Sequence, residues 1–507
     1  MNAEQLKADS GFSRVRAMLK GLGPEGGSID APGDRGRKVP GGGWSSVFEV
    51  PPEFEGPSNQ ICGLWPFSAG SGLPADGAIL GRHQTQMATV CADPVTWFLK
   101  GRILNPSAFI LGRPGLGKST LLRRMVTFLA AKGVVPMVLS DLKPDYVKLV
   151  EALGGLVIRV GHGGDSVNPL DPGPAVKALP LMETKDATRV REQLRGRRLN
   201  TLAGLCELVL GAALSVNELT ALRTAIRVLD PDLDNTPVVD EVRELIEGRH
   251  EEVRRVIRDR GNDARYDERT ERLVDALQGV GSEGPFGSTF SQHTTVPLEL
   301  GRAMVFDMSE VDDNDLQLQG ALQLVCWSYG SAVVQGAKTL AAAGLAPERI
   351  YLLVMDELWR ALRASLQMVD RIDAITRLNR QLLFPQIMCT HTMDDLRLAT
   401  EEATSRAWGF VERSEMVFLG GLAPKEMGNL DQVFGMPEKE KNMVTTWSDM
   451  NTATGSGQPA GLGLFLLKLG SNPGIPFRVD LTALEAEVND TNTRWAEFER
   501  GRREEVA

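Results

Sequence analysis

A glycine-rich loop from Gly112 to Ser119 has residue types and spacing that imply chemistry. It reads Gly-Arg-Pro-Gly-Leu-Gly-Lys-Ser and fits the pattern G-x-x-x-x-G-K-[ST] completely. Glycines let a backbone wrap closely around phosphate oxygens with its N–H groups turned inward. In such a loop Lys118 reaches the β and γ phosphates, and the Ser119 hydroxyl ligates Mg²⁺. The loop therefore predicts binding of ATP and Mg²⁺.

The predicted nucleotide-binding set is this loop with the residue that follows it. Its members are Gly112, Arg113, Pro114, Gly115, Leu116, Gly117, Lys118, Ser119 and Thr120. A surface loop could match the pattern by chance, but here an apolar run precedes the loop and an amphipathic run follows it. A strand before the loop and a helix after it are the required context, because the helix then aims its positive end at the phosphates.

Two carboxylates directly follow a strongly apolar segment. Ile350 to Met355 suits a buried parallel strand, and Asp356 and Glu357 come next. We expect Asp356 to hold Mg²⁺ through water and Glu357 to polarise the water for in-line attack. Acidic residues also end strands without a catalytic role, so the prediction depends on the pairing with the loop. Asp307, after another apolar run, is a weaker rival because no second carboxylate follows it.

In ATP-hydrolysing motors with such a loop, hydrolysis also needs a γ-phosphate sensor and an arginine from a neighbouring subunit. His391 comes after the apolar run Gln386 to Cys389 and could hydrogen-bond the γ-phosphate or the attacking water. A structural histidine at a strand end is the alternative. Arg377, Arg380 and Arg413 are candidates for the arginine that acts in trans, and each could instead be an ordinary surface arginine.

These side chains need a sheet that brings strand ends together. A strand over Ala108 to Leu111, the loop, a helix over Ser119 to Ala131 and a strand over Val134 to Leu139 are typical of a parallel α/β sheet. Later strands are expected at Ala303 to Asp307, Ile350 to Met355, Gln386 to Cys389 and Glu415 to Leu419, with helices at about 314–338 and 358–381. Gly463 to Lys468 and Pro476 to Val479 are expected as edge strands.

The chain divides into five predicted segments. They are an N-terminal helix and Gly/Pro-rich linker (1–60), lead-in strands and the first part of the ATPase core (61–175), an all-helical insertion (176–284), the second part of the core (285–485) and a charged tail (486–507). The insertion opens with a basic stretch that ends in Arg195-Gly-Arg-Arg198. That cluster could follow a DNA phosphate backbone, and a solvated helix face is the alternative.

Composition excludes several classes of protein. With 507 residues, 42% of them hydrophobic, and a net charge of −10, the chain resembles a globular protein that is not coated with nucleic-acid-binding surface. Five scattered cysteines without a C-x-x-C favour a reducing compartment over a disulfide framework or a zinc site. No secretory signal and no long apolar run are visible, so we expect a cytoplasmic protein without a transmembrane segment.

The order of these motifs resembles the FtsK–HerA branch of RecA-like ring ATPases, and within it the conjugative-transfer and type IV secretion energiser ATPases. Besides the loop, the resemblance rests on Ser140 to Tyr146, Leu153 to Gly155, Asn168 to Asp171, Val305 to Asp307, Met355 to Trp359, Thr390-His391 and Thr491-Asn492. It implies an α/β fold, with a RecA-like P-loop NTPase core, a mainly parallel central sheet, an all-helical insertion and a small N-terminal lead-in.

The resemblance also implies a hexameric ring with ATP between subunits and Arg380 as the first choice for the trans arginine. The expected function is an ATP-hydrolysing motor that energises conjugative DNA transfer or type IV secretion-like machinery. Its partners would be components of that membrane complex, at the inner face of the membrane. The alternatives are a translocase acting directly on DNA and a nucleotide-dependent scaffold with little turnover. The family usually ends the sensor strand in Thr-Gln, whereas this chain has Thr390-His391.

Overall fold

The computed structural model describes residues 73–488, apart from 313, 365 and 450–458. All elements below lie in one compact unit, Pro74–Ala507. The predicted N-terminal helix and linker (1–60), Thr491-Asn492 and the tail from 489 onward lie outside the described residues. Within the described part, no helix has both the length and the apolar character needed to cross a membrane.

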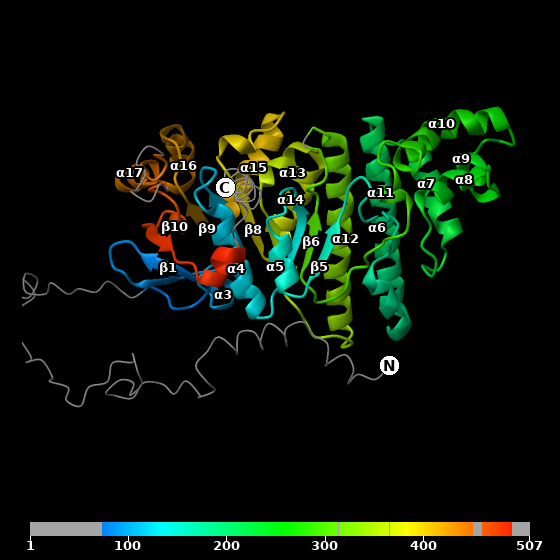
Figure 1. The fold of residues 1–507 in the computed structure, drawn as a ribbon. Helices are drawn as coiled ribbons and strands as arrows, with labels where there is room; N and C mark the ends of the chain where they lie inside the picture. The colour runs from blue at the N-terminus through cyan, green and yellow to red at the C-terminus, as the bar shows by residue number, and fades with distance from the viewer. Residues whose placement is uncertain (1–72, 313, 365, 450–458, 489–507) are drawn as a thin grey trace, which may run out of the picture. The chain divides into compact units, whose positions relative to one another are not determined.

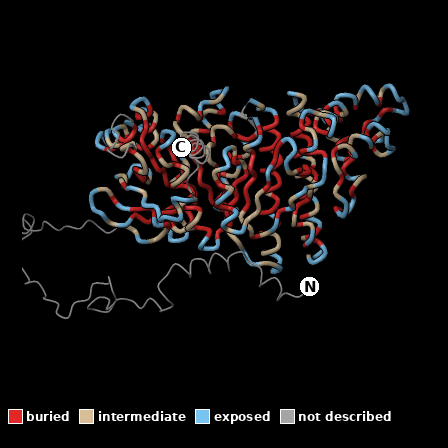
Figure 2. Tube along the Cα trace, in the orientation of Figure 1, coloured by how far each residue is buried: buried red, intermediate tan, exposed pale blue. Residues whose placement is uncertain are grey.

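The core of the described chain is an 11-stranded sheet in the order β2-β1-β11-β10-β9-β3-β8-β7-β4-β6-β5. The strands are β1 Ile79–His83, β2 Thr89–Cys91, β3 Ser107–Leu111, β4 Val135–Asp141, β5 Leu156–Arg159, β6 Met304–Asp307, β7 Tyr351–Met355, β8 Gln386–Thr390, β9 Met416–Leu419, β10 Leu464–Lys468 and β11 Ile475–Val479. Buried residues run along these strands (Figure 2).

The half of the sheet from β9 to β5 is entirely parallel. Its strands are short apolar runs: every residue of β3, β7 and β8 is buried, as in sheets covered on both faces. The predicted α/β class with a mainly parallel sheet is therefore confirmed. The prediction that the last two strands are edge strands is wrong. β10 pairs with β9 and β11, and β11 pairs with β1, all antiparallel, so the lead-in strand β2 forms that edge.

Helices pack around the sheet (Figure 1). Those outside the helical insertion are α3 Pro94–Leu99, α4 Lys118–Ala131, α5 Val147–Ala152, α12 Leu316–Ala342, α13 Leu358–Ala364, α14 Leu366–Leu378, α15 Glu401–Arg413, α16 Met427–Phe434, α17 Glu438–Thr446 and α18 Ala483–Val488, with short 3-10 turns at η3 Asp394–Leu396 and η4 Pro424–Glu426. One helix was predicted over 358–381, whereas the structure has α13 and α14 there and α14 ends at Leu378.

Between β5 and β6 every regular element is helical. The elements are η2 Pro174–Leu181, α6 Thr184–Leu210, α7 Val216–Leu229, α8 Val239–Glu247, α9 Glu251–Ile257, α10 Asp263–Val280 and α11 Ser288–Ser291. Helix α7 starts with a capping box in which Ser215 and Glu218 satisfy each other's backbone N–H groups. Helix α6 packs on α12 (Figure 1), which joins this helical layer to the sheet.

Candidate active site

The glycine-rich loop lies between β3 and α4, as its function requires. Gly115 and Gly117 have φ angles of +78° and +94°, which favour glycine over residues with a side chain. The loop is fixed from outside: the Arg113 amide donates to the carbonyl of Gly421 at 2.9 Å, and the Gly463 amide donates to Leu116 at 3.1 Å. Lys118 is buried and starts α4, so its ammonium remains inside the loop.

Strand order explains why the predicted catalytic groups meet. β8 lies directly between β3, which leads into the loop, and β7, which leads into Asp356 and Glu357. All three strands are parallel, with Leu111 opposite Thr390 and Met355 opposite Met388. Their carboxyl ends therefore share one edge of the sheet, where ligands bind in open α/β folds. The Gly112 amide also donates to the His391 carbonyl at 3.1 Å, which joins the loop to the end of β8.

His391 connects the lysine of the loop to the glutamate. The Lys118 ammonium lies 2.9 Å from His391 Nδ1 and 3.3 Å from the carbonyl oxygen of Arg113. On the other side of the imidazole, Nε2 lies 3.0 Å from a carboxylate oxygen of Glu357. Three residues that were predicted separately from the sequence thus form one continuous set of contacts.

Glu357 is held by further donors. Lys143 Nζ lies 3.1 Å from Oε1, and the Trp359 indole N–H donates to Oε2 at 2.7 Å. Burial alone would raise the pKa of Glu357, but the contact with His391, the charge of Lys143 and the hydrogen bond from Trp359 lower it well below its usual range. The carboxylate is therefore ionised, as a base must be. Its φ of +49° is unusual for a residue with a side chain.

Asp356 is positioned from the opposite side. The hydroxyl of the buried Tyr146 donates to one carboxylate oxygen at 2.9 Å, and the Glu357 amide donates to the other at 2.9 Å. Sequence reasoning did not assign Lys143, Tyr146 or Trp359 to the site. The available signal was their place in the two segments that carry the family resemblance, Ser140 to Tyr146 and Met355 to Trp359.

The surroundings of Asp356 suit a divalent cation. Burial and then the charges of Asp145, Asp307 and Asp356 raise the pKa of the nearby Asp141, despite a hydrogen bond from the Tyr146 amide. Negative charge is thus concentrated at a place where a bound divalent cation would reduce the repulsion between the carboxylates. Among the residues that the structure describes, no group of three or more His, Cys, Asp or Glu side chains could hold a metal alone. A Mg²⁺ ion would therefore use Asp356, the Ser119 hydroxyl, water and nucleotide oxygens.

Asp307, the rival to Asp356, lies farther from the loop. Its strand, β6, is two positions beyond β7 in the sheet, so Asp307 lies roughly 10 Å farther across it. One Asp307 oxygen accepts a hydrogen bond from the Ser309 amide at 3.0 Å. The geometry favours Asp356 as the metal-side acid.

The three candidate trans arginines differ in their contacts. Arg377 and Arg413 both bind Asp373, at 2.8 and 2.6 Å. Arg380 is exposed, stacks over the ring of Phe98 at 5.9 Å and has no carboxylate partner among the described residues. Arg380 comes just before β8 starts, at the edge of the sheet opposite to the loop. Within this chain Arg380 therefore lies away from the loop.

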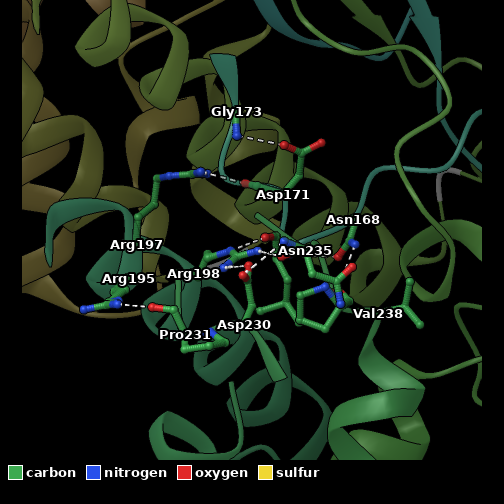
Figure 3. Close-up of polar contacts among 12 residues, drawn as sticks. Asn168, Asp171, Gly173, Arg195, Arg197, Arg198, Asp230, Pro231, Asn235 and Val238 are labelled. Atoms are coloured by element: carbon green, nitrogen blue, oxygen red, sulfur yellow. Dashed lines mark hydrogen bonds and ion pairs between the residues drawn. The ribbon is translucent and has the colours of Figure 1, made fainter. Parts of the chain in front are cut away.

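The basic cluster of the insertion is mostly internal, which corrects its interpretation as a DNA-following surface or a solvated helix face (Figure 3). Arg198 is fully buried and pairs with Asp230 at 2.8 Å. Arg197 donates to the carbonyl of Asp171 at 2.6 Å, and burial lowers its pKa to about 10. Arg195 pairs with Glu192 at 2.8 Å and remains partly exposed. Arg198 also donates to the carbonyl of Leu170, so two of the three arginines hold α6 to the turn at Leu170 and Asp171.

Comparisons with known proteins concern the fold and the family. Residues 91–324 match the family described as Helicase HerA, central domain. The structure of VirB4 of Thermoanaerobacter pseudethanolicus shares the fold, with a TM-score of 0.60 and 18% identity over 82% of this chain and 100% of that chain. Plasmid coupling protein TrwB, in complex with ADP and Mg²⁺, aligns with a TM-score of 0.43 and 10% identity over 74% of this chain and 86% of that chain. No curated protein sequence matches. The predicted resemblance to the FtsK–HerA branch is confirmed.

Proposed function

We propose that this chain, with its central domain of HerA type, is a Mg-ATP-hydrolysing motor that energises conjugative DNA transfer or type IV secretion-like machinery. The observation that carries the proposal is the convergence of Lys118, His391, Glu357 and Asp356 at one edge of the sheet. A chance glycine-rich loop would have no reason to meet an ionised glutamate and a second carboxylate there. The VirB4 fold supports the secretion context.

Each residue of the site has a role in this proposal. The loop amides and Lys118 bind the phosphates, and Ser119 and Asp356 hold Mg²⁺, which neutralises charge on the phosphate oxygens. Glu357 accepts a proton from the attacking water, and the hydrogen bonds from Lys143 and Trp359 keep its carboxylate ionised and oriented. His391 lies beside both Lys118 and Glu357, where a γ-phosphate sensor is needed.

The protein would act as a homo-oligomer, with a hexameric ring as the arrangement that the family resemblance favours. Arg380 would act in trans, because Arg377 and Arg413 are already paired with Asp373. The ATPase core would comprise residues 61–175 and 285–485, interrupted by the helical insertion 176–284, with 486–507 as a charged tail. We place the protein in the cytoplasm, at the inner face of the membrane through its partners.

Steady-state ATP hydrolysis, measured with no DNA, with single-stranded DNA and with duplex DNA, tests this function. The proposal predicts low, Mg²⁺-dependent activity that DNA does not change and that Glu357→Gln abolishes. Strong stimulation by DNA would favour a translocase acting directly on DNA. Nucleotide binding without any turnover above the Glu357→Gln variant would favour a scaffold and would contradict the motor.

A further inference from the structure

A single imidazole contacts two groups that have different tasks in ATP hydrolysis. His391 Nδ1 lies 2.9 Å from the Lys118 ammonium, and Nε2 lies 3.0 Å from the Glu357 carboxylate. The side chains of His391 and Glu357 are only 21% and 16% exposed, so water competes little for these contacts. The ring can reach both groups because β8 lies between the strands that carry them.

These contacts fix the hydrogens of the ring. An ammonium group has only donors, so Lys118 donates and His391 Nδ1 accepts. The hydrogen of the neutral ring is then on Nε2 and points at the Glu357 carboxylate, which only accepts. A doubly protonated ring would turn an N–H toward the ammonium. In the neutral ring, these contacts correspond to the tautomer that carries its hydrogen on Nε2.

Both partners are engaged elsewhere in the protein as well. Lys118 also donates to the carbonyl of Arg113, within the loop that would hold phosphate. Glu357 accepts from Trp359 on the same oxygen as His391 and contacts Lys143 through the other. In this arrangement Lys118 donates to protein groups where a phosphate would compete for it, and three protein donors hold the Glu357 carboxylate.

We infer that His391 is a latch: one ring restrains both the lysine that binds phosphate and the glutamate that activates water. This inference rests on the proposed ATPase function and concerns its regulation. When phosphate oxygens take the Lys118 ammonium, Nδ1 loses its donor and the ring can turn. Its hydrogen bond to Glu357 is then released, so occupancy of the loop and freedom of the base are coupled.

Binding of Mg-ADP to the full-length chain separates the latch from the sensor role, because ADP has no γ-phosphate for His391 to contact. His391→Ala and His391→Phe both remove the acceptor for Lys118, so both should bind ADP more tightly, by roughly ten- to a hundredfold for one charged hydrogen bond. His391→Gln can still accept from Lys118 and donate to Glu357, so its affinity should stay near that of the wild type. His162→Ala, at an exposed histidine, is the matched control.

The outcomes distinguish failure of the latch from failure of the ATPase assignment. Equal or weaker ADP binding by both His391→Ala and His391→Phe overturns the latch and leaves the ATPase proposal intact. ADP binding that Lys118→Ala does not weaken overturns the assignment of the site itself. Tighter binding by His391→Gln as well would show that loss of the ring, rather than loss of the acceptor, is responsible, and would also overturn the latch.

Discussion

Short sequence motifs predicted some side chains of the site and missed others. Lys118, Ser119, Asp356 and Glu357 follow from a phosphate-binding loop and a strand that ends in two acids. Lys143, Tyr146 and Trp359 do not, because their roles depend on β4 and α13 lying beside the end of β7. A lone tyrosine or tryptophan is usually a core residue, and only the contacts to Asp356 and Glu357 reveal otherwise.

Tyr146→Phe tests the support of Asp356. The side chain of Tyr146 is buried and its hydroxyl donates to Asp356 at 2.9 Å, so its removal leaves a partly buried carboxylate oxygen without that donor. We expect a loss of about 1 kcal/mol in the free energy of unfolding and a changed Mg²⁺ requirement for hydrolysis. Urea denaturation and a Mg²⁺ titration of ATPase rate measure both. Tyr266→Phe removes a buried hydroxyl that is bonded to the Ile246 carbonyl in the insertion, so it should reproduce only the stability loss.

Asp141→Asn tests the concentration of negative charge beside the site. The raised pKa of Asp141 means that the folded state binds this proton more tightly than the unfolded chain. Its ionisation therefore costs stability as the pH rises above about 4. At about pH 8 the free energy of unfolding of the variant should exceed that of the wild type by an amount on the order of 1 kcal/mol, so the variant should melt at a higher temperature. This difference in stability should become smaller as the pH falls. If the stability difference between the variant and the wild type, measured without nucleotide, did not change with pH, ionisation of Asp141 would not be its cause.

At the scale of helices and strands, the sequence identified the parallel half of the sheet because buried strands are unbroken apolar runs. The sequence did not predict which strands pair where hydrophobicity alone does not identify the neighbouring strand. β10 and β11 were expected at an edge, but β1 and β2 from the distant lead-in pair outside them. β5 was not predicted, since four residues after two glycines give too short a pattern. The buried role of Arg197 and Arg198 was also invisible, because charge suggests a surface.

Arg198→Ala tests the anchor of the helical insertion. It would leave Asp230 buried without its partner, and breaking such a pair from one side costs about 3–5 kcal/mol. We expect the thermal unfolding transition to move down or to split, with early loss of the α6–α7 region. Arg189→Ala removes an exposed arginine from the same helix, paired with Asp186, and should change stability little. Similar melting of the two variants would contradict the anchor.

At the scale of the whole molecule, the proposed ring depends on a residue that no single subunit can use. Arg380 lies at the edge of the sheet opposite to its own loop, so in the proposed ring it would act on the nucleotide of a neighbour. From the sequence, only the family resemblance put Arg380 ahead of Arg377 and Arg413, and the contacts of those two arginines with Asp373 add a physical reason for that choice.

Mixing two inactive variants tests this arrangement. Arg380→Ala should bind ATP but lose turnover by roughly 10³-fold, the size of effect that such arginines have. A Lys118→Ala subunit has a defective loop but an intact Arg380 to offer a neighbour. Mixed oligomers of the two should therefore recover part of the activity, whereas Arg377→Ala alone should remain active. No recovery in oligomers shown to contain both chains would contradict action in trans.

Single-turnover hydrolysis of bound ATP tests the central assignment most directly. Wild type and Glu357→Gln are each loaded with radiolabelled Mg-ATP, and bound nucleotide and product are followed together. We expect equal or tighter binding by Glu357→Gln and hydrolysis slower by roughly 10²- to 10⁴-fold, because only the base is lost. Hydrolysis at the wild-type rate in that variant would show that the site defined by Lys118, His391 and Glu357 is not where the chemistry occurs.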